Sequence, residues 1–262
     1  MRTIADTGAE KNPVSVREIM AYSLACLCNG LAGAAYNLMT PLVVLTLGMS
    51  PVLAGFIMAI KTLWDAFTDP LMATITDNAN TPWGRRRPFI LVGGILLTVI
   101  CVVLWFGLPV GDRAKPNVQP APVATSVSAA ATGPAASAPT AAPARPPAAK
   151  GFGKVWSNGW EAVKATPVEE RRIFIYLTIA MMLVATAHTI FSVPYYALGI
   201  ELSPTYHGRT RVVAYRSIFE KLLGLTGPWY LPFCMLAVFS TAIEGAAWLM
   251  VIMAVLAVPA LV

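Results

Sequence analysis

The feature that most constrains this chain is a run of apolar residues, long enough to form a helix, that carries three charged side chains in its interior. The run extends over residues 51–75 and contains Lys61, Asp65 and Asp69. Because charge at bilayer depth is costly, such residues normally face a water-filled cavity or a partner inside a helix bundle. Their spacing of four residues places all three on one face of a helix. We therefore expect that face to carry the function.

The composition indicates a multi-span, all-helical membrane protein. Apolar residues make up 56% of the chain and charged residues only 12%, against about 25% charged in a soluble domain. The mean hydropathy is +0.64, and segments long enough to cross about 30 Å of hydrocarbon recur along the chain. The net charge of +6 does not indicate nucleic-acid binding, because the basic residues collect in loops beside the apolar runs. The four cysteines lie within apolar runs without metal-site spacing, so we expect buried thiols.

The alternation of apolar and polar segments predicts two groups of three spans. A polar tail over residues 1–17 precedes the first group in residues 18–108, and the second group follows in residues 172–262. The expected spans are residues 18–47, 51–75, 88–108, 172–200, 213–241 and a sixth that starts near residue 243.

An insert over residues 109–171 separates the two groups. Its first part, up to about residue 150, is rich in Pro and Ala, and this composition predicts disorder. Beyond it, Trp156 and Trp160 recur at helical spacing among basic residues, which predicts an amphipathic helix. That helix could lie on the membrane surface with its tryptophans at headgroup level, or it could pack against the protein outside the membrane.

The short loops predict the orientation. If the spans alternate, the tail, the basic loop at residues 85–87 and the loop holding Arg209 and Arg211 all lie on one side. The positive-inside rule makes that side cytoplasmic, so we expect a multi-pass protein of the plasma (inner) membrane with a cytoplasmic N-terminus. Since the sixth apolar segment is uninterrupted up to Val262, we also expect its span to be truncated and the chain to be a fragment.

Two long motifs resemble those of a known transporter family. They are WDAFTDP (residues 64–70) with Asp77 and WGRRRPF (residues 83–89), and VPYYALG (residues 193–199) followed by ELS (201–203), RTR (209–211) and Tyr215-Arg216. The chain resembles the glycoside–pentoside–hexuronide:cation symporters, the melibiose-permease branch of the major facilitator superfamily, and RRRPF is also similar to the sucrose-transporter branch. A full member would have twelve spans in two six-helix halves, with substrate near the midplane. The resemblance therefore implies an N-terminal six-helix half, with the C-terminal half as the absent partner.

This resemblance implies a cation site. Asp65 and Asp69 match the family's cation-site carboxylates, and Thr189 matches a hydroxyl of the fourth span that helps to bind the cation. Carboxylate and hydroxyl oxygens suit Na⁺, and a carboxylate pair can alternatively take up H⁺. A structural ion pair between spans is the alternative. Lys61, one turn before Asp65, could compensate its charge, so we expect weakened or absent Na⁺ dependence, and no cofactor beyond the coupling ion.

The resemblance also implies a substrate site with an unusual composition. Asn29 and Ser192 stand where melibiose permease has carboxylates, Tyr196 occupies an aromatic stacking position, and Arg216 matches a position near the site. Tyr36 lies on the polar face of the first span with Asn29. These groups can bind sugar hydroxyls or stack on a sugar ring, whereas the loss of both acids argues against galactoside specificity. His188 we expect to pack inside the bundle and to lie off the face of Ser192 and Tyr196.

The loop between the second and third spans resembles the cytoplasmic gate motif of the superfamily. Gly84 permits a tight turn, and Asp77 can form ion pairs with Arg85, Arg86 and Arg87 that close one end. Anchoring of the loop by its three arginines is compatible with the same role.

The sequence favours secondary active transport of a sugar or glycoside with Na⁺ or H⁺ by alternating access. Transport of an amphipathic, lipid-like solute and a non-transporting sensor or scaffold remain alternatives. An intramembrane enzyme is disfavoured, because Asp65 and Asp69 lie on one helix about 6 Å apart in rise, whereas acid pairs need two groups that converge on one water.

Overall fold

The computed structural model describes residues 15–108, 150–203 and 205–261, and every regular element in these ranges is a helix. The predicted tail falls mostly outside the described residues, and so does the Pro- and Ala-rich part of the insert. The helices are α1 (Val16–Leu24), α2 (Cys26–Leu47), α3 (Pro51–Asn78), α4 (Arg87–Phe106), α5 (Lys150–Ala165), α6 (Val168–Glu201), α7 (Tyr206–Gly224), α8 (Gly227–Cys234) and α9 (Ala242–Ala257), and a 3₁₀ turn (Val258–Leu261) follows α9.

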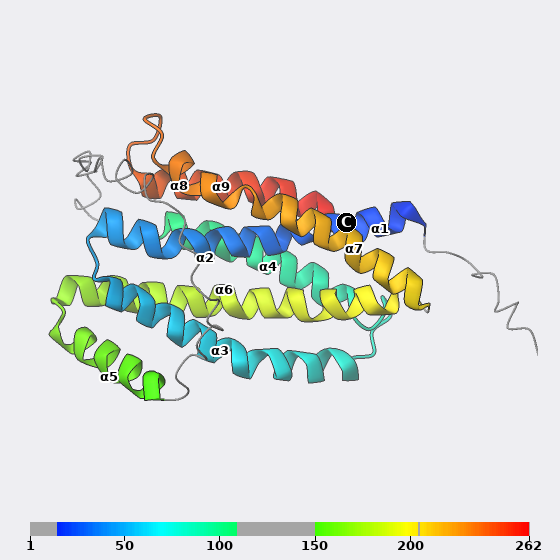
Figure 1. The fold of residues 1–262 in the computed structure, drawn as a ribbon, viewed down its shortest axis with the longest axis horizontal. Coiled ribbons are helices and arrows are strands. Elements are labelled where there is room, and N and C mark those ends of the chain that lie inside the picture. The colour runs from blue at the N-terminus through cyan, green and yellow to red at the C-terminus, as the bar shows by residue number, and fades with distance from the viewer. Residues whose placement is uncertain (1–14, 109–149, 204, 262) are drawn as a thin grey trace, which may run out of the picture.

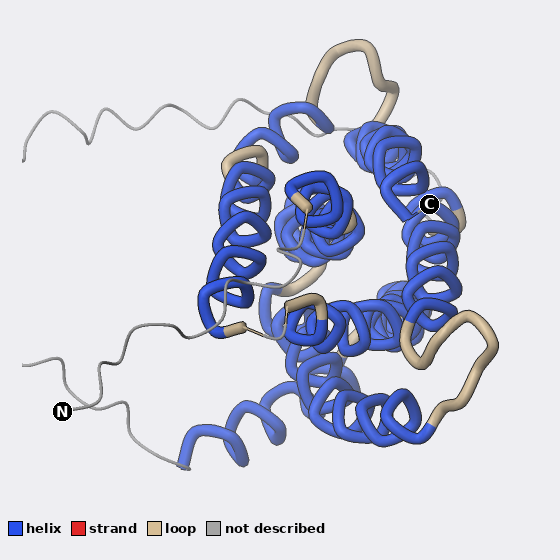
Figure 2. Tube along the Cα trace, turned by 90° about the vertical axis from the view of Figure 1, so that its right-hand side faces the viewer, coloured by secondary structure: helices blue, strands red, loops and turns tan. Residues whose placement is uncertain are grey.

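The long helices run side by side as one bundle (Figure 1). Among the described residues, four segments are long and apolar enough to cross a membrane, namely Val16–Leu47, Pro51–Asn78, Arg87–Phe106 and Glu170–Glu201. Helix α9 is apolar but shorter. Figure 2 turns the bundle by 90°, so that most helices are seen foreshortened and lie around one another rather than in a single row. The predicted all-helical membrane architecture is confirmed.

Local sequence signals explain where the helices begin and end. Ser15 and Glu18 form a capping box at the start of α1. Gly48 ends α2 with a φ of 66°, the left-handed conformation that glycine adopts without steric cost. Ser50 then caps α3, whose first residue is Pro51. The turn over residues 48–50 thus reverses the chain and makes α3 antiparallel to α2 (Figure 1).

The fifth predicted span differs from the structure. Instead of one helix over residues 213–241, α7 begins at Tyr206, where the Thr205 side chain accepts a hydrogen bond from the Gly208 amide. The helix stops at Gly224, and α8 starts again at Gly227 and ends at Cys234. The α8 segment contains Pro232, which lacks an amide hydrogen, and residues 235–241 are not helical. Arg209 and Arg211, which the sequence predicts in a loop, therefore lie on α7.

Close contacts hold α6 against its neighbours α4 and α1. A Cβ atom at Gly93 of α4 would lie 2.6 Å from the Phe191 backbone nitrogen, so only glycine permits this approach of α4 to α6. At the other side, Tyr22 and Tyr195 each donate a hydroxyl hydrogen bond to the other's backbone carbonyl, at 3.2 and 3.0 Å, and their rings stack. These buried contacts hold α1 and α4 against α6, which carries several of the predicted site residues.

Helix α5 forms where the amphipathic pattern predicts it, and it lies along the outside of the first half of α3 (Figure 1). Gly159 is buried against the Phe56 ring of α3, and the Trp156 ring meets the same ring edge-on at 5.1 Å. Trp160 is 53% exposed. The contact with α3 agrees with a helix packed against the protein. The exposed Trp160 is compatible with a helix that lies at the membrane surface.

Candidate functional site

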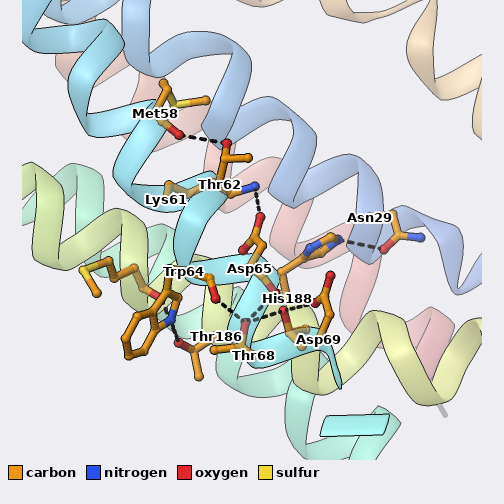
Figure 3. Close-up of polar contacts among 12 residues, drawn as sticks. Asn29, Met58, Lys61, Thr62, Trp64, Asp65, Thr68, Asp69, Thr186 and His188 are labelled. Atoms are coloured by element: carbon orange, nitrogen blue, oxygen red, sulfur yellow. Dashed lines mark hydrogen bonds and ion pairs between the residues drawn. The ribbon is translucent and has the colours of Figure 1, made fainter. Parts of the chain in front are cut away.

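The charged face of α3 points into the bundle, toward α2 and α6 (Figure 3). Near the middle of α3, the Lys61 ammonium lies 2.5 Å from Asp65 Oδ2. The same ammonium lies over the Tyr36 ring of α2, 4.1 Å from the ring centroid. Both side chains of the ion pair are mostly shielded, with 15% and 26% exposure for Lys61 and Asp65. The ammonium therefore neutralises this carboxylate and also gains a cation–π contact.

Asp69, one turn further along α3, has a different partner. Thr189 of α6 donates its hydroxyl to Asp69 Oδ1 at 2.9 Å, and the Thr68 hydroxyl lies 3.5 Å from the Thr189 hydroxyl. Thr189 is buried, whereas Asp69 stays exposed in this chain. The two acids are thus unequal, since Asp65 already holds an internal cation and Asp69 holds a neutral donor. The predicted cation-site residues Asp65, Asp69 and Thr189 do come together.

Asn29 of α2 joins two residues of α6. Its amide nitrogen donates to the Tyr196 hydroxyl at 3.0 Å, and its amide oxygen lies 3.2 Å from His188 Nε2. Because an amide oxygen can only accept, Nε2 carries the proton in this contact. The expectation that His188 lies off the face of Ser192 and Tyr196 is wrong. The three residues are spaced four apart, so helical periodicity puts them on one face, and this signal could have found His188.

The remaining predicted substrate residues surround this contact. The Arg216 guanidinium of α7 lies over the Tyr196 ring, 4.6 Å from its centroid, and Arg216 Nε is 3.9 Å from the Glu220 carboxylate. Ser192 is buried on α6, one turn before Tyr196. The Tyr36 hydroxyl is buried with no hydrogen-bond partner among the described residues. The site thus presents hydroxyls, an amide, aromatic faces and one guanidinium, a set that can bind the hydroxyls and ring faces of a sugar.

The gate residues lie at the far end of α3, where its last turn meets the ends of α4 and α6. Arg86 Nη2 lies 3.0 Å from Asp77 Oδ1, and Arg86 Nη1 lies 2.9 Å from Glu201 Oε1. Gly84 turns the chain with a φ of 97°. In the described part of the chain, Arg85 and Arg87 are exposed and form no ion pair. One arginine therefore ties α3 to α6, through a second acid, Glu201, that the motif did not indicate.

The donor set suits a hard monovalent cation or a proton. Within the described residues, no group of three or more His, Cys, Asp or Glu side chains could hold a metal ion. The four cysteines are free and buried, as predicted. Two carboxylates with neighbouring hydroxyl oxygens offer the ligands that alkali cations accept, and a carboxylate can instead take up a proton.

A helical membrane bundle with a polar, charged interior face is the architecture of a secondary transporter's helical domain. Comparison with known proteins agrees with this class. The chain matches the family described as MFS/sugar transport protein over residues 22–119 and 144–262. The protein therefore belongs to the MFS/sugar transport protein family, and the resemblance to the glycoside–pentoside–hexuronide:cation symporters is confirmed.

Individual relatives match shorter segments. A sucrose transport protein of Oryza sativa subsp. japonica is 35% identical over 75 residues, which are 29% of this chain and 14% of the relative. A glucuronide carrier protein homolog of Escherichia coli (strain K12) is 33% identical over 98 residues, covering 36% of this chain and 21% of the relative. A lactose permease of Lactobacillus helveticus is 28% identical over 108 residues, covering 36% and 17%. The chain thus covers less than a quarter of each of these relatives.

Proposed function

We propose that these helices form part of a secondary active transporter that carries a sugar or glycoside together with a cation by alternating access. The named relatives are a sucrose transport protein, a lactose permease and a glucuronide carrier homolog, and this supports a carbohydrate as the substrate class. The chemistry around Asn29 and Tyr196 supports the same class, because an amide, hydroxyls and an aromatic face are the groups that bind sugars.

The observation that carries the proposal is the inward-facing pair of acids on α3. A carboxylate inside a membrane bundle is costly unless it binds a partner, and here two of them lie one turn apart between α2 and α6. A purely structural ion pair would need one acid. The second acid, Asp69, is held only by a neutral hydroxyl and remains accessible, which is the state expected of a group that binds and releases an ion in each cycle.

We infer that the coupling ion is H⁺ rather than Na⁺. The Lys61 ammonium lies where a cation would contact Asp65, so a second cation would have to displace it. Asp69 can still exchange a proton, with the Thr189 hydroxyl bound to its carboxylate. His188 is the residue before Thr189 on α6, and it is bound to Asn29, one of the proposed substrate residues. Protonation of Asp69 can therefore affect the substrate residues through Thr189 and His188.

The gate and orientation follow from the same scheme. With the N-terminus in the cytoplasm of the plasma (inner) membrane, the Arg86 contacts with Asp77 and Glu201 close the cytoplasmic end. A second set of helices would complete the substrate site from the opposite side, as the greater length of the relatives suggests. Breaking the Arg86 contacts and reforming contacts at the other end would then alternate the access.

The proposal is tested by reconstituting the full-length transporter in proteoliposomes and measuring uptake of radiolabelled sucrose, lactose and glucuronides. An inward proton gradient should drive accumulation of one of these sugars, and a protonophore should abolish it. An equal Na⁺ gradient without a proton gradient should not drive accumulation. The absence of uptake and of counterflow for every sugar in the panel would refute carbohydrate transport.

A further inference from the structure

We propose that Glu220 on α7 supplies the carboxylate that binds a hydroxyl pair of the substrate, a role that rests on the proposed sugar transport. The residues assigned so far to the substrate include no acid, since they are Asn29, Tyr36, Ser192, Tyr196 and Arg216. The structure brings a carboxylate of α7, that of Glu220, into the lining of a pocket that also includes Asn29.

The first observation is a pocket between α2 and the α7–α8 segment. Its volume is about 170 Å³, and its lining includes Asn29, Asn37 and Glu220. Sites for drug-sized ligands measure roughly 300–1,000 Å³, so this pocket is of a size for one sugar ring or part of one. The pocket is also lined by three glycines, Gly30, Gly33 and Gly224. Because glycine has no side chain, these positions leave space for a ligand between α2 and α7.

The second observation is the state of the Glu220 carboxylate. Its ion-pair contact with Arg216 Nε measures 3.9 Å, which is longer than a hydrogen bond. Its side chain is 44% exposed, and it is the one acid among the described residues that line the pocket. An ionised carboxylate can accept about four hydrogen bonds, so both oxygens of Glu220 are available to a ligand in the pocket.

The third observation is the link between Glu220 and the residues already assigned to the substrate. Arg216 lies one turn before Glu220 on α7 and stacks on the Tyr196 ring. Tyr196 in turn accepts a hydrogen bond from Asn29, which lines the pocket with Glu220. A sugar ring in the pocket would meet Asn29 on one wall and Glu220 on the other, with Arg216 and Tyr196 beside it. Adjacent sugar hydroxyls match the two oxygens of a carboxylate, and this bond is charge-assisted.

The test measures sugar binding to the full-length transporter carrying Glu220→Gln. The probes are sucrose, lactose and a glucuronide, together with the monodeoxy analogues of whichever of them the wild type binds. A hydrogen bond to a charged group is worth about 10- to 150-fold in affinity, so Glu220→Gln should weaken binding of the parent sugar by roughly that factor. The analogue that lacks the bound hydroxyl should lose less than about threefold. Glu220→Asp should recover part of the affinity, and the control Glu161→Gln on α5 should leave it unchanged.

Each other result overturns the proposal in a distinct way. If Glu220→Gln binds the parent sugar as the wild type does, the carboxylate does not touch substrate. If it weakens every deoxy analogue by the same factor as the parent sugar, Glu220 only positions Arg216. If the wild-type transporter binds none of these sugars, the proposed sugar transport fails, and the role of Glu220 fails with it.

Discussion

Replacing Lys61 by methionine should convert the transporter from a Na⁺-independent to a Na⁺-responsive one. Methionine keeps much of the lysine side chain's length and removes its charge. In the wild type, the Lys61 ammonium lies 2.5 Å from Asp65 Oδ2 and over the Tyr36 ring. Any Na⁺ that approaches Asp65 must displace this tethered cation, and without Lys61 the carboxylate is free to bind Na⁺.

The geometry sets the size of the effect. At 2.5 Å and an effective dielectric constant of about 20, the attraction within the pair is about 7 kcal/mol, but most of it is offset by desolvation of the two charges. Hydrogen bonds to charged groups contribute a net 1.5–3 kcal/mol or so. We therefore expect Lys61→Met to raise the apparent Na⁺ affinity by about 10- to 150-fold.

The assay is sugar uptake by full-length transporter in proteoliposomes, with Na⁺ varied and choline chloride keeping the ionic strength constant. Lys164→Met is the matched control, because Lys164 is an exposed lysine of α5 that also forms an ion pair, with Glu161. Wild type and control should show no response to Na⁺, and Lys61→Met should show a saturable one. A strong Na⁺ requirement in the wild type, or no Na⁺ response in a Lys61→Met variant that still transports, would show that Lys61 does not keep Na⁺ from Asp65.

Three further predictions concern the bundle. In thermal unfolding, Arg86→Ala should lower the free energy of unfolding by only about 1 kcal/mol, because the two acid partners of Arg86 are more than half exposed. The control Arg85→Ala should leave it unchanged, and equal effects of the two variants would contradict the assigned contacts. Gly93→Ala should lower the free energy of unfolding by about 1–3 kcal/mol, because the added methyl group forces α4 away from α6. In the control Gly55→Ala the methyl group meets no atom within 4 Å, so this variant should be neutral or stabilised by up to about 1 kcal/mol. An equal loss of stability in both variants would show that α4 and α6 are not in close contact. This chain expressed alone should insert into membranes but take up no sugar, and measurable uptake would contradict a substrate site shared with further helices.

Much of the fold could be predicted because hydrophobicity and turn chemistry act locally. Gly48 and Ser50 mark the turn between α2 and α3, and the apolar runs mark the long helices. The fifth span differs from its prediction for the same reason, since its apolar stretch continues across Pro232, which has no amide hydrogen to donate, whereas α8 ends two residues later at Cys234. Likewise, the start of α7 depends on a cap by Thr205, whereas the polar composition of this segment alone predicts a loop.

The candidate site was predictable only in part, because sequence motifs place residues on helices and not helices against one another. The motif indicated Asp65, Asp69 and Thr189, and they are close together. Periodicity alone would have put His188 on the face of Tyr196. No local pattern reveals that Glu201 meets Arg86, because that contact depends on the start of α4 lying beside the end of α6.

The most direct test of the account compares accumulation with exchange in full-length Asp69→Asn. Asparagine keeps the shape of the side chain and an oxygen for the Thr189 hydroxyl but cannot take up a proton at neutral pH. Counterflow, which needs only alternating access, should persist, while accumulation of sugar against its gradient under an imposed proton gradient should disappear. Accumulation by Asp69→Asn equal to that of the wild type would contradict the claim that this inward-facing acid carries the coupling ion.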